Sequence, residues 1–411
     1  MRVLQVNKYL YRRGGAEAYM FGLADLLQGA GHEVGFFGME YPANDPMPYQ
    51  RYFPPQVDFE PPPGALGKAK AVGRMLWSFS AKKGLAGVLE HFQPDIVHCH
   101  NIYHQLSPSV LSAAADAGVP VVMTLHDYKL ACPTYQLLDN GRLCDACVPR
   151  HFSQAWRRAC RDHSRSQSGV MALELAAHTW SGAYDPVARF LCPSRFLADT
   201  MRRARVYPER LQVLPNFCDD LDGIATRDAD AIAGPVVYAG RLSPEKGVDT
   251  LIDAVVASGG LECVIAGEGP ERSHLEDRAA AAGDRIRFVG RLDRAEVLDL
   301  LRSGGCAAVP SRWHENQPMV ILEAFACGIP VVSTNLGGLP DLVHPDINGL
   351  LVPPDDPAAL GGALRRLSAE PELAAAMGRR ARAYVEDHHQ PRRHLEEMLA
   401  VYGDVRATRA T

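Results

Sequence analysis

The chain has 411 residues, of which 47% are apolar and 22% are charged, and its net charge is −5. This length favours two domains over a single core. The negative balance argues against nucleic acid as the main partner, which would favour a basic surface. The N-terminal residues lack the apolar core of a signal peptide, and no run reaches the ~18 apolar residues of a membrane span. Ten cysteines without a secretion signal indicate a reducing cytoplasm.

The first residues of the chain predict a strand, a helix and a second strand. Arg2–Asn7 has the pattern of the first strand, Ala16–Leu27 that of the helix and His32–Phe37 that of the next strand. Gly14 and Gly15 lie between the first strand and the helix, where glycine lets the backbone approach a phosphate closely. A glycine pair at a helix start is often only a turn, so it is weak support by itself.

A loop and a basic segment follow. Residues 41–64 are rich in proline and aromatic residues and are expected to form an ordered loop. Residues 66–91 predict one helix, on which lysine and arginine alternate with apolar residues. Such a helix can lie on an anionic membrane surface, although a core-packed helix with a solvated basic face is the simpler explanation. Peripheral membrane contact is one expectation for this segment.

Histidines end two predicted strands of the first half. The strand Asp95–Asn101 carries His98 and His100, which are two residues apart and therefore lie on one face. The strand Val121–Asp127 brings His126 to its carboxyl end. Histidines at two strand ends favour a functional site over core packing, and a metal site is one alternative.

Four cysteines are grouped in the segment after His126. Their spacing is Cys-x11-Cys-x2-Cys-x12-Cys, and thiolates in this pattern can share one Zn²⁺ ion. An iron–sulfur cluster would use the same ligands, and four unrelated thiols are the plain alternative. The segment is rich in charges and poor in large apolar residues, which favours a structural metal as a staple. The candidate ligands are Cys132, Cys144, Cys147 and Cys160.

The second half begins with a polar stretch, residues 219–234, which predicts a linker. Asp228–Asp230 inside it resembles a metal-binding Asp-x-Asp triplet, but it follows no strand and receives no function. The next strand, Val236–Gly240, leads into a loop that carries Arg241 and Lys246. A guanidinium fork and an ammonium group at a strand end suit the two phosphates of a nucleoside diphosphate.

A strand–loop–helix–strand unit lies at residues 306–334. Glu315 is in its loop, and Glu323 is about one turn into its helix, whose first N–H groups favour an anion. Beside a phosphate site, a carboxylate can hold hydroxyl groups, as acids do on a ribose. Two isolated glutamates would more often be solvated side chains. The predicted elements are the strand Cys306–Val309, the loop Arg312–Pro318, the helix Met319–Cys327 and the strand Val331–Thr334.

The surroundings of the two glutamates carry a family pattern. Glu-x7-Glu within Pro-Ser…Leu-Glu-Ala…Gly-x-Pro-Val-Val…Gly-Gly resembles the retaining glycosyltransferases of family four, with the GT-B fold, a group that is glycogen-synthase-like and mannosyltransferase-like. The resemblance covers most of the chain. It implies two Rossmann-like α/β domains, each a doubly wound parallel sheet, which face each other across a cleft. The expected domains are residues 1–217, with a helix at 390–411 packing back on them, and residues 218–389.

The resemblance also implies roles for the candidate residues, with the donor on the second domain and the acceptor mainly on the first. Arg241 and Lys246 would stabilise the departing diphosphate without a metal ion. His126 would line the reaction centre, Glu315 would orient the sugar and Glu323 would hold the ribose. The expected donor-binding residues are Gly14, Gly15, Gly240, Arg241, Lys246, Gly290, Asn316, Gln317, Pro318, Met319, Val320 and Glu323, and the acceptor-side residues are His100 and Asn101.

The expected function is sugar transfer with retention from a nucleoside-diphosphate sugar, with UDP as the expected carrier. The acceptor is expected to be a hydroxyl of a glycan, a lipid-linked sugar or a small metabolite, in the cytoplasm or at the inner face of the membrane. Two alternatives stay open: a sugar-nucleotide epimerase or hydrolase on the same fold, and a non-catalytic nucleotide-sugar-binding partner. The acceptor itself depends on loops that carry no readable code.

Overall fold

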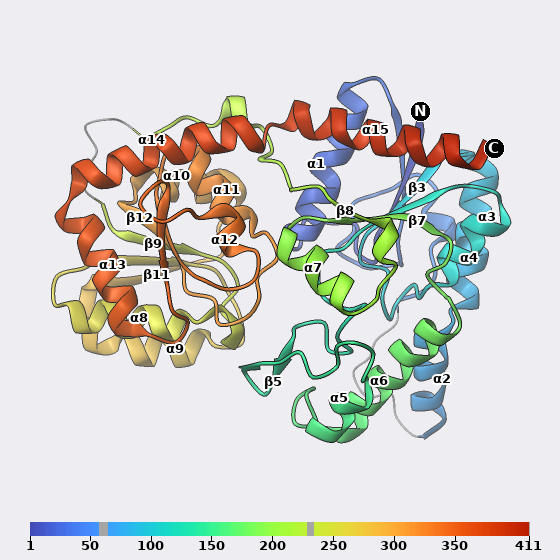
Figure 1. Cartoon of the computed structure of the whole chain (residues 1–411), viewed down its shortest axis with the longest axis horizontal. Coiled ribbons are helices and arrows are strands. Elements are labelled where there is room, and N and C mark those ends of the chain that lie inside the picture. Colours follow the sequence, from blue (N-terminus) through green and yellow to red (C-terminus); the bar gives the residue numbers. More distant parts are fainter. Residues whose placement is uncertain (57–64, 228–233, 411) are drawn as a thin grey trace. The chain divides into compact units, whose positions relative to one another are not determined.

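A computed structural model describes residues 1–56, 65–227 and 234–410 of the chain. Its contacts divide the chain into two units, each built on its own six-stranded sheet (Figure 1). Unit 1 comprises Met1–Asn140, Cys144–Pro215 and Arg392–Thr411, and unit 2 comprises Gly141–Leu143 and Asn216–Pro391. Every strand pair in the two large sheets is parallel, which confirms the predicted fold class of two parallel-sheet α/β domains.

The sheet of unit 1 has the strand order β2-β1-β3-β4-β7-β8. β2 lies on one side of β1 in the sheet, and β3 and all later strands lie on the other side of β1. The direction of winding therefore reverses between β1 and β3. In such sheets ligands bind outside the carboxyl ends of the strands at the reversal. The strands are β1 (Arg2–Val6), β2 (Glu33–Phe37), β3 (Ile96–Cys99), β4 (Val121–Thr124), β7 (Val187–Cys192) and β8 (Leu211–Val213).

Several helices of unit 1 share an apolar core with this sheet, and a two-stranded hairpin lies in the segment after β4. The helices are α1 (Gly15–Gly29), α2 (Ala65–Leu76), α3 (Phe79–Phe92), α4 (Ser109–Asp116), α5 (Ser153–Arg158), α6 (Arg165–Trp180) and α7 (Arg195–Arg203), with 3-10 turns at Gln50–Tyr52 and Pro208–Arg210; the hairpin strands are β5 (Leu138–Asp139) and β6 (Arg142–Leu143).

The single helix predicted over residues 66–91 is wrong, because the structure has two helices there, α2 and α3. The buried Ser78 separates them, and its hydroxyl accepts a hydrogen bond from the backbone N–H of Ala81 at 3.3 Å, which begins α3. Lys82, one of the expected surface cations, pairs with Asp116 at 2.8 Å. The side chains of residues 68–70 lie outside the described part of the structure.

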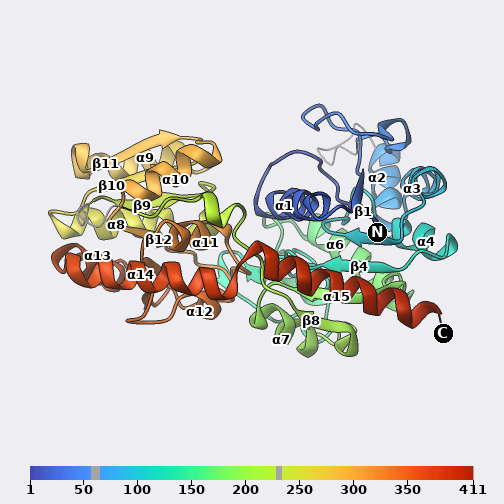
Figure 2. The same ribbon diagram turned by 90° about the horizontal axis from the view of Figure 1, so that it is seen from above.

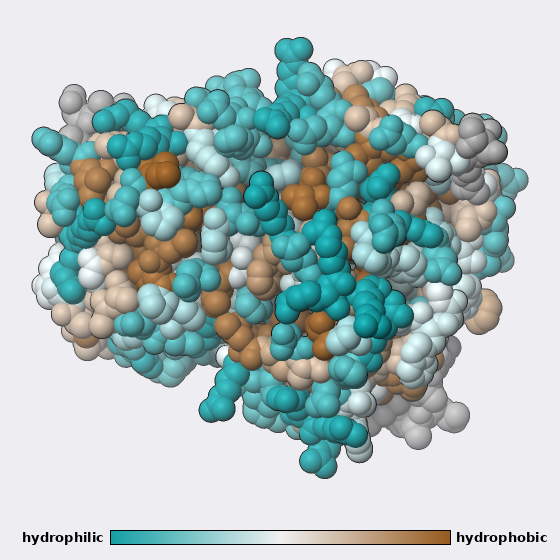
Figure 3. Space-filling view, in the orientation of Figure 1, coloured by the Kyte–Doolittle hydropathy of each residue, from teal (hydrophilic) through white to brown (hydrophobic). Residues whose placement is uncertain are grey.

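Peripheral membrane contact by this segment stays a prediction. Hydrophilic side chains interrupt the apolar ones over the face in Figure 3. None of the helices in the described ranges is long and apolar enough to cross a membrane.

The sheet of unit 2 has the order β11-β10-β9-β12-β13-β14, the Rossmann arrangement, so its winding reverses between β9 and β12. The strands are β9 (Val236–Ala239), β10 (Cys263–Ala266), β11 (Ile286–Gly290), β12 (Cys306–Val309), β13 (Val331–Thr334) and β14 (Gly349–Val352). The helices are α8 (Val248–Ser258), α9 (Arg272–Ala279), α10 (Arg294–Ser303), α11 (Met319–Ala326), α12 (Leu339–Leu342), α13 (Pro357–Ala369) and α14 (Pro371–His388), with 3-10 turns at Leu221–Gly223, Pro244–Lys246 and Ala280–Arg285.

The segment expected to be a polar linker is partly core. Leu221 and Ile224 are buried in the apolar core of unit 2, because they pack with residues of β12 and α11. The triplet Asp228–Asp230 lies outside the described residues.

The last helix, α15 (Pro391–Ala410), returns to unit 1 and runs along its sheet (Figure 1, Figure 2). Met398 and Tyr402 on this helix are fully buried. Near the end of the helix, Arg406 pairs with Asp95 at 2.9 Å, at the start of the β3 region. This helix therefore completes the core of the first unit from the other end of the sequence.

Candidate active site

Two loops at the winding reversal of unit 2 carry the predicted cations and acids. The loop after β9 contains Arg241 and Lys246, and the loop after β12 contains Glu315. The two loops press closely together. Gly247 has a φ of +65°, and a Cβ on it would lie 2.1 Å from the carbonyl oxygen of Pro310. Only glycine can occupy this position, so Gly247 allows the loop with the two cations to lie in contact with the loop that carries Glu315.

Lys246 and Glu315 form a buried ion pair between these loops. The Nζ of Lys246 lies 2.7 Å from Oε1 of Glu315, which also accepts the hydroxyl hydrogen of Ser311 at 2.6 Å. Burial by itself would raise the pKa of Glu315, but the Lys246 ammonium and these hydrogen bonds outweigh it and lower the pKa. Glu315, only 5% exposed, therefore stays charged and fixes the position of the Lys246 ammonium.

The backbone of Arg241 is fixed by a hydrogen bond, and its side chain is exposed to solvent. The Tyr238 hydroxyl donates to the carbonyl oxygen of Arg241 at 2.9 Å, which anchors the loop. The guanidinium is exposed and makes no ion pair with any described residue. A cation that is positioned in this way can meet an anionic ligand without first breaking an internal contact.

The start of α11 adds partial positive charge beside the same loop. Pro318 precedes the helix, and the first N–H groups of the helix, at Met319 and Val320, have no acceptor within it. The side chain of Gln317 has a partner within the protein: its oxygen accepts a hydrogen bond from the backbone N–H of Asn216. The predicted donor-binding segment thus combines helix-end amides with a side chain that is tied to the beginning of the main segment of unit 2.

Glu323 lies on the second turn of α11 and is less well partnered than Glu315. Its nearest cation is Arg294 on α10, with 3.7 Å between Nε and Oε1, which is too long for a strong hydrogen bond. Burial raises the pKa of Glu323, the charge of Asp219 adds to this, and Arg294 opposes it. Hydrogen-bond donors from a ligand would stabilise the charged form of this carboxylate.

The predicted glycines differ in what the fold requires of them. Gly290 ends β11 with a φ of +78°, and Gly240 follows β9, where a Cβ would lie 2.9 Å from the Tyr238 hydroxyl. Gly14 precedes α1, which begins at Gly15; the backbone of Gly14 is extended, and a Cβ on it would have Glu17 as its nearest neighbour, at 3.7 Å. The fold itself does not exclude a side chain at Gly14, so the open space there is available to a ligand.

The histidines of unit 1 form a stacked row. His98 and His100 stack with ring centroids 4.4 Å apart, and His100 Nδ1 lies 3.0 Å from His126 Nε2. Both ring nitrogens of His98 and of His100 have protein partners, so neither ring has a lone pair to offer a metal. These contacts give no support to the metal alternative for the two histidines. His126, which is half-buried, is the member of the row with exposed surface.

Burial lowers the pKa of His126 to about 3, so its ring is neutral near pH 7. The predicted acceptor-side residue Asn101 follows β3 next to His100, and its backbone N–H donates to Asn7 Oδ1 at 3.0 Å. The side-chain oxygen of Asn101 is buried and has no hydrogen-bond partner in the described part of the chain. An acceptor atom without a donor suits a ligand hydroxyl.

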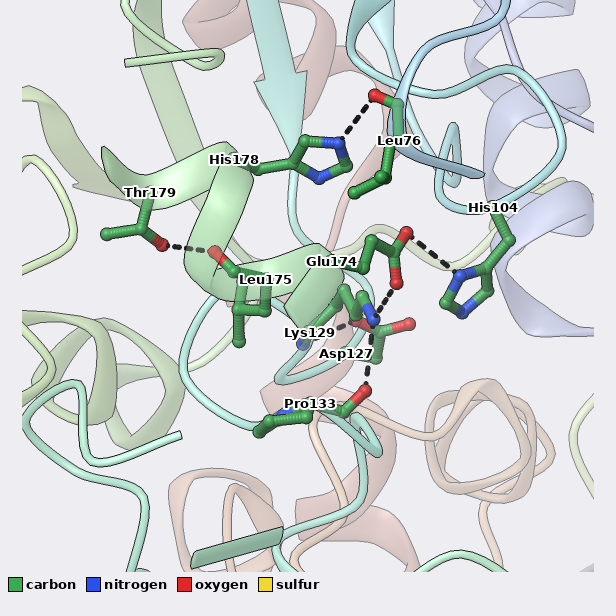
Figure 4. A network of polar contacts seen from close by, with 9 residues as sticks. All are labelled: Leu76, His104, Asp127, Lys129, Pro133, Glu174, Leu175, His178 and Thr179. Carbon is green, nitrogen blue, oxygen red and sulfur yellow. Dashed lines mark hydrogen bonds and ion pairs between the residues drawn. The ribbon is translucent and has the colours of Figure 1, made fainter. Parts of the chain in front are cut away.

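A buried polar network supports the loop that follows His126 (Figure 4). The backbone N–H of Lys129 donates to Asp127 Oδ1 at 2.9 Å, and Lys129 Nζ donates to Glu174 Oε2 at 2.8 Å. Glu174 Oε1 lies 3.0 Å from His104 Nδ1. The network ties the end of β4 to α6 and to the loop after β3, so it fixes where the His126 loop lies.

Several residues at these loops were not predicted. Ser311 positions Glu315, Arg294 faces Glu323, and Lys8 follows β1 at the winding reversal of unit 1. Burial lowers the pKa of Lys8, although Asp127 and Glu17 favour its charged form. Lys8 could have been predicted from its position at the end of a strand. Ser311 could have been predicted from the Pro-Ser pair to which it belongs. No local signal connects Arg294 to a glutamate on another helix.

The cysteine segment has more apolar core than its composition indicated. Cys147, Phe152 and Ala155 pack with Leu175 and other residues of α6, so this segment, although poor in large apolar residues, is held in part by a small apolar core. All four candidate thiols are free. In the described ranges no group of three or more histidine, cysteine or acidic side chains is arranged to hold a metal ion. The structural metal at Cys132, Cys144, Cys147 and Cys160 gains no support from this geometry and stays a prediction for elemental analysis.

The two sheets define a two-domain α/β protein with cationic side chains in a loop at the strand ends of unit 2. Residues 13–220 match the model of Glycosyltransferase Family 4, and residues 234–384 match that of Glycosyl transferases group 1. The chain therefore belongs to this family of glycosyltransferases, which confirms the resemblance seen in its motifs.

The similarity to several known proteins extends over nearly the whole chain. A D-inositol 3-phosphate glycosyltransferase of Salinispora tropica is 28% identical, over 97% of this chain and 82% of that protein. The sucrose-phosphate synthase of Thermosynechococcus elongatus has the same fold, with a TM-score of 0.72 and 20% identity over 99% of both chains. An Anabaena protein in complex with UDP has a TM-score of 0.68 and 19% identity, over 98% of this chain and 100% of that chain.

Proposed function

We propose that the protein transfers a sugar, with retention at the anomeric carbon, from a UDP-sugar to a hydroxyl group of its acceptor. The observation that carries the proposal is the pairing of an exposed Arg241 with a Lys246 fixed by Glu315 at the winding reversal of unit 2. UDP as the carrier is supported by the Anabaena protein, which has the same fold and whose structure contains UDP.

In the proposed reaction the bond from the anomeric carbon to the phosphate oxygen breaks, and a bond to the acceptor oxygen forms on the same face. The acceptor proton passes to the departing diphosphate. Arg241, Lys246 and the amide end of α11 stabilise the charge that develops on that diphosphate, a contribution of several kcal/mol. Glu315 is a poor nucleophile because Lys246 and Ser311 lower its pKa, so attack by the acceptor on the face that the diphosphate leaves is favoured over a covalent intermediate.

His126 acts in this scheme as a neutral hydrogen-bonding group. With a pKa of about 3 its ring is neutral near pH 7, so it is not a general acid, and it is a weak base. Its contribution is to orient a hydroxyl group at the reaction centre.

A thermal-shift panel of UDP-, GDP- and ADP-sugars tests the carrier, because a ligand that binds the folded state raises the melting temperature. UDP-sugars are expected to give the largest shift. Transfer of the sugar to added hydroxyl acceptors, with the anomeric configuration read by NMR, tests the reaction. Isomerisation of the donor without an acceptor would instead support the epimerase, and binding without turnover would support a non-catalytic partner.

Glu323→Gln is expected to weaken donor affinity about tenfold while the melting temperature of the ligand-free protein stays unchanged or rises. The amide keeps the shape but accepts hydroxyl hydrogens less strongly, and it removes a charge that burial disfavours. Donor titration by calorimetry and a ligand-free melt measure the two effects. Glu90→Gln, on the exposed surface of α3, is the matched control. Unchanged affinity, or a large loss of ligand-free stability, would remove Glu323 from the donor site.

Activity is expected to survive EDTA, because two side-chain cations and a helix end supply the charge that Mg²⁺ supplies in other sugar transferases. Initial rates are compared before and after chelation and buffer exchange. Recovery of lost activity by Mg²⁺ or Mn²⁺ would contradict the expectation. Elemental analysis of the same preparations, with Cys144→Ser as control, tests the separate prediction of a structural zinc or iron–sulfur centre.

A further inference from the structure

Unit 1 has a cavity that the proposed reaction does not use. It encloses about 370 Å³, which is enough for a small ligand, and all of its lining residues belong to unit 1. Among them, Tyr184 and Asp185 precede β7, and Val206 and Tyr207 precede β8. His126 instead follows the carboxyl end of β4. The amino and carboxyl ends of parallel strands lie at opposite edges of a sheet, so this wall of the cavity lies at the edge opposite to His126.

The cavity has an apolar floor and a charged rim. Arg150 and Asp185 line it, and both of these residues are exposed. An apolar surface with a few polar groups that converge on it is the usual construction of a small-molecule site. The buried residues of the lining are Leu130, Phe152, Tyr184 and Val206.

Trp180, the last residue of α6, is part of the cavity wall, and its side chain is 78% exposed. The turn of helix that carries it is fixed, because the hydroxyl of Thr179 donates to the carbonyl oxygen of Leu175 at 2.7 Å (Figure 4). An aromatic ring at the edge of a cavity contributes most to binding when a ligand removes its surface from water. Trp180 therefore favours a ligand with a flat apolar face.

Asp185 is held as a hydrogen-bond acceptor at the same cavity. Its Oδ1 accepts the hydroxyl hydrogen of Tyr207 at 2.6 Å, and its backbone N–H donates to the carbonyl oxygen of Gly182 at 2.8 Å. Gly182 has a φ of +65°, and a Cβ on it would lie 2.3 Å from Oδ2 of Asp185, so glycine is required here. Oδ2 accepts no hydrogen bond from any described residue and can accept one from a ligand.

Arg150 supplies hydrogen-bond donors to the cavity. Its Nη2 donates to the carbonyl oxygen of Arg205 at 2.6 Å, which positions the guanidinium, and it forms no ion pair within the described ranges. An anionic ligand would meet the carboxylate of Asp185, and a cationic ligand would meet Arg150. A neutral ligand that carries hydroxyl groups avoids both costs, because a hydroxyl can donate to the carboxylate and accept from the guanidinium.

We propose that this cavity, the Trp180 pocket, binds one ring of a neutral saccharide and is a second carbohydrate site of the protein. The C–H face of a pyranose packs on the indole of Trp180, and its hydroxyl groups bond to Asp185 Oδ2 and Arg150. The Trp180 pocket goes beyond the proposed transfer reaction and does not depend on it. A glycan held here by one ring has a raised effective concentration at any other saccharide site of the chain.

The test uses the full chain labelled with 5-fluorotryptophan, whose ¹⁹F NMR spectrum has one signal for each of its four tryptophans. Single tryptophan-to-phenylalanine variants assign the signals. We expect glucose, N-acetylglucosamine and maltose at millimolar concentrations to shift the Trp180 signal saturably. Trp156, which is exposed on α5 and does not line the cavity, is the internal control and should not shift.

The same spectra keep the Trp180 pocket apart from the proposed function. UDP is expected to shift the signal of Trp313, which lies in the loop that carries Glu315, and to leave Trp180 unchanged. A saccharide shift at Trp180 without a UDP shift at Trp313 would count against the donor site alone. The reverse result would overturn the Trp180 pocket alone.

Two comparison ligands test the chemistry of the occupant. Adenosine has a flat base that can also stack on an indole, and inorganic phosphate needs only the guanidinium of Arg150. A Trp180 shift with either of these but with none of the saccharides would overturn the proposal. Equal shifts of Trp180 and Trp156 with the saccharides would overturn it too, because they would show unspecific contact.

Asp185→Asn keeps the acceptor for Tyr207 but replaces the free oxygen by a donor. We expect it to weaken saccharide affinity about tenfold, read from the Trp180 signal, because a charge-assisted hydrogen bond is lost. Asp199→Asn, on the exposed surface of α7 outside the cavity, is the matched control. If Asp185→Asn folds poorly, Arg150→Met removes the donors at the other side of the rim. Saccharide affinity that is unchanged in the folded variant would overturn the proposal.

Discussion

Replacing Arg241 by alanine is expected to lower kcat about a hundredfold and to leave the melting temperature unchanged. The guanidinium is exposed and has no ion pair with any described residue, so folding loses little when it is removed. Turnover loses a preorganised positive charge at the departing diphosphate, and the loss of one such group costs on the order of 10² in rate. Steady-state kinetics at saturating donor, together with a thermal melt, measure both quantities.

Lys246→Ala is expected to cause a similar loss of turnover but also to lower the melting temperature. Without the ammonium, the carboxylate of Glu315 is buried with no cation at 2.7 Å. The double variant Lys246→Ala/Glu315→Gln should therefore regain stability without regaining turnover. Lys83→Ala, on the exposed surface of α3, is the control for loss of a lysine. Near-normal turnover of an Arg241→Ala/Lys246→Ala variant would refute the diphosphate assignment.

The sheets could be predicted from the sequence because their strands are short apolar runs that end at glycine, proline or polar residues. The expected strand Val331–Thr334 coincides with β13, which is buried throughout. The error at residues 66–91 arose because apolar residues recur at helical spacing on both sides of Ser78. Ser78 caps the second helix, and a serine in that position is a local signal that could have been used.

The candidate site was predictable where strand-end position and residue type suffice. Arg241, Lys246 and Glu315 were identified in this way, and the structure brings Lys246 and Glu315 into contact. Contacts between distant segments were not predictable, because they depend on how the elements pack. Tyr402 and His98 are 304 positions apart, and no local pattern links them. The return of the last helix was expected only from the family resemblance.

Replacing Lys129 by methionine is expected to lower the free energy of unfolding by about 3–5 kcal/mol, the usual cost of removing one partner from a buried ion pair. The Lys129 and Glu174 side chains are each only 2% exposed, with 2.8 Å between Nζ and Oε2. In the wild type, burial and the charge of Lys129 lower the pKa of His104 to about 4, so His104 is neutral at pH 7 and Lys129 is the cation that pairs with Glu174. Chemical denaturation followed by tryptophan fluorescence measures the loss.

The control is Lys82→Met, which breaks the pair with Asp116 at the surface, where the side chains are 32% and 63% exposed. Its cost should stay within about 1 kcal/mol. Lys129→Met/Glu174→Gln should cost much less than Lys129→Met, because no charge is left buried. If Lys129→Met costs no more than Lys82→Met, the network does not hold the His126 loop.

The pH dependence of the same variants provides an independent check. Burial by itself would raise the pKa of Glu174, but Lys129 and His104 bring it down to about 2 in the folded protein, below its ordinary value of 4.5. The stability that this carboxylate contributes is therefore complete above pH 4.5 and is lost as the pH falls toward 2. Lys129→Met removes the largest cause that lowers this pKa while burial remains, so the folded-state pKa is expected to rise above 4.5 and the sign to reverse. Lowering the pH from 7 to 5 should then narrow the stability gap between Lys129→Met and the wild type, and a gap that widens instead would contradict the assignment of Lys129 as the partner of a charged Glu174.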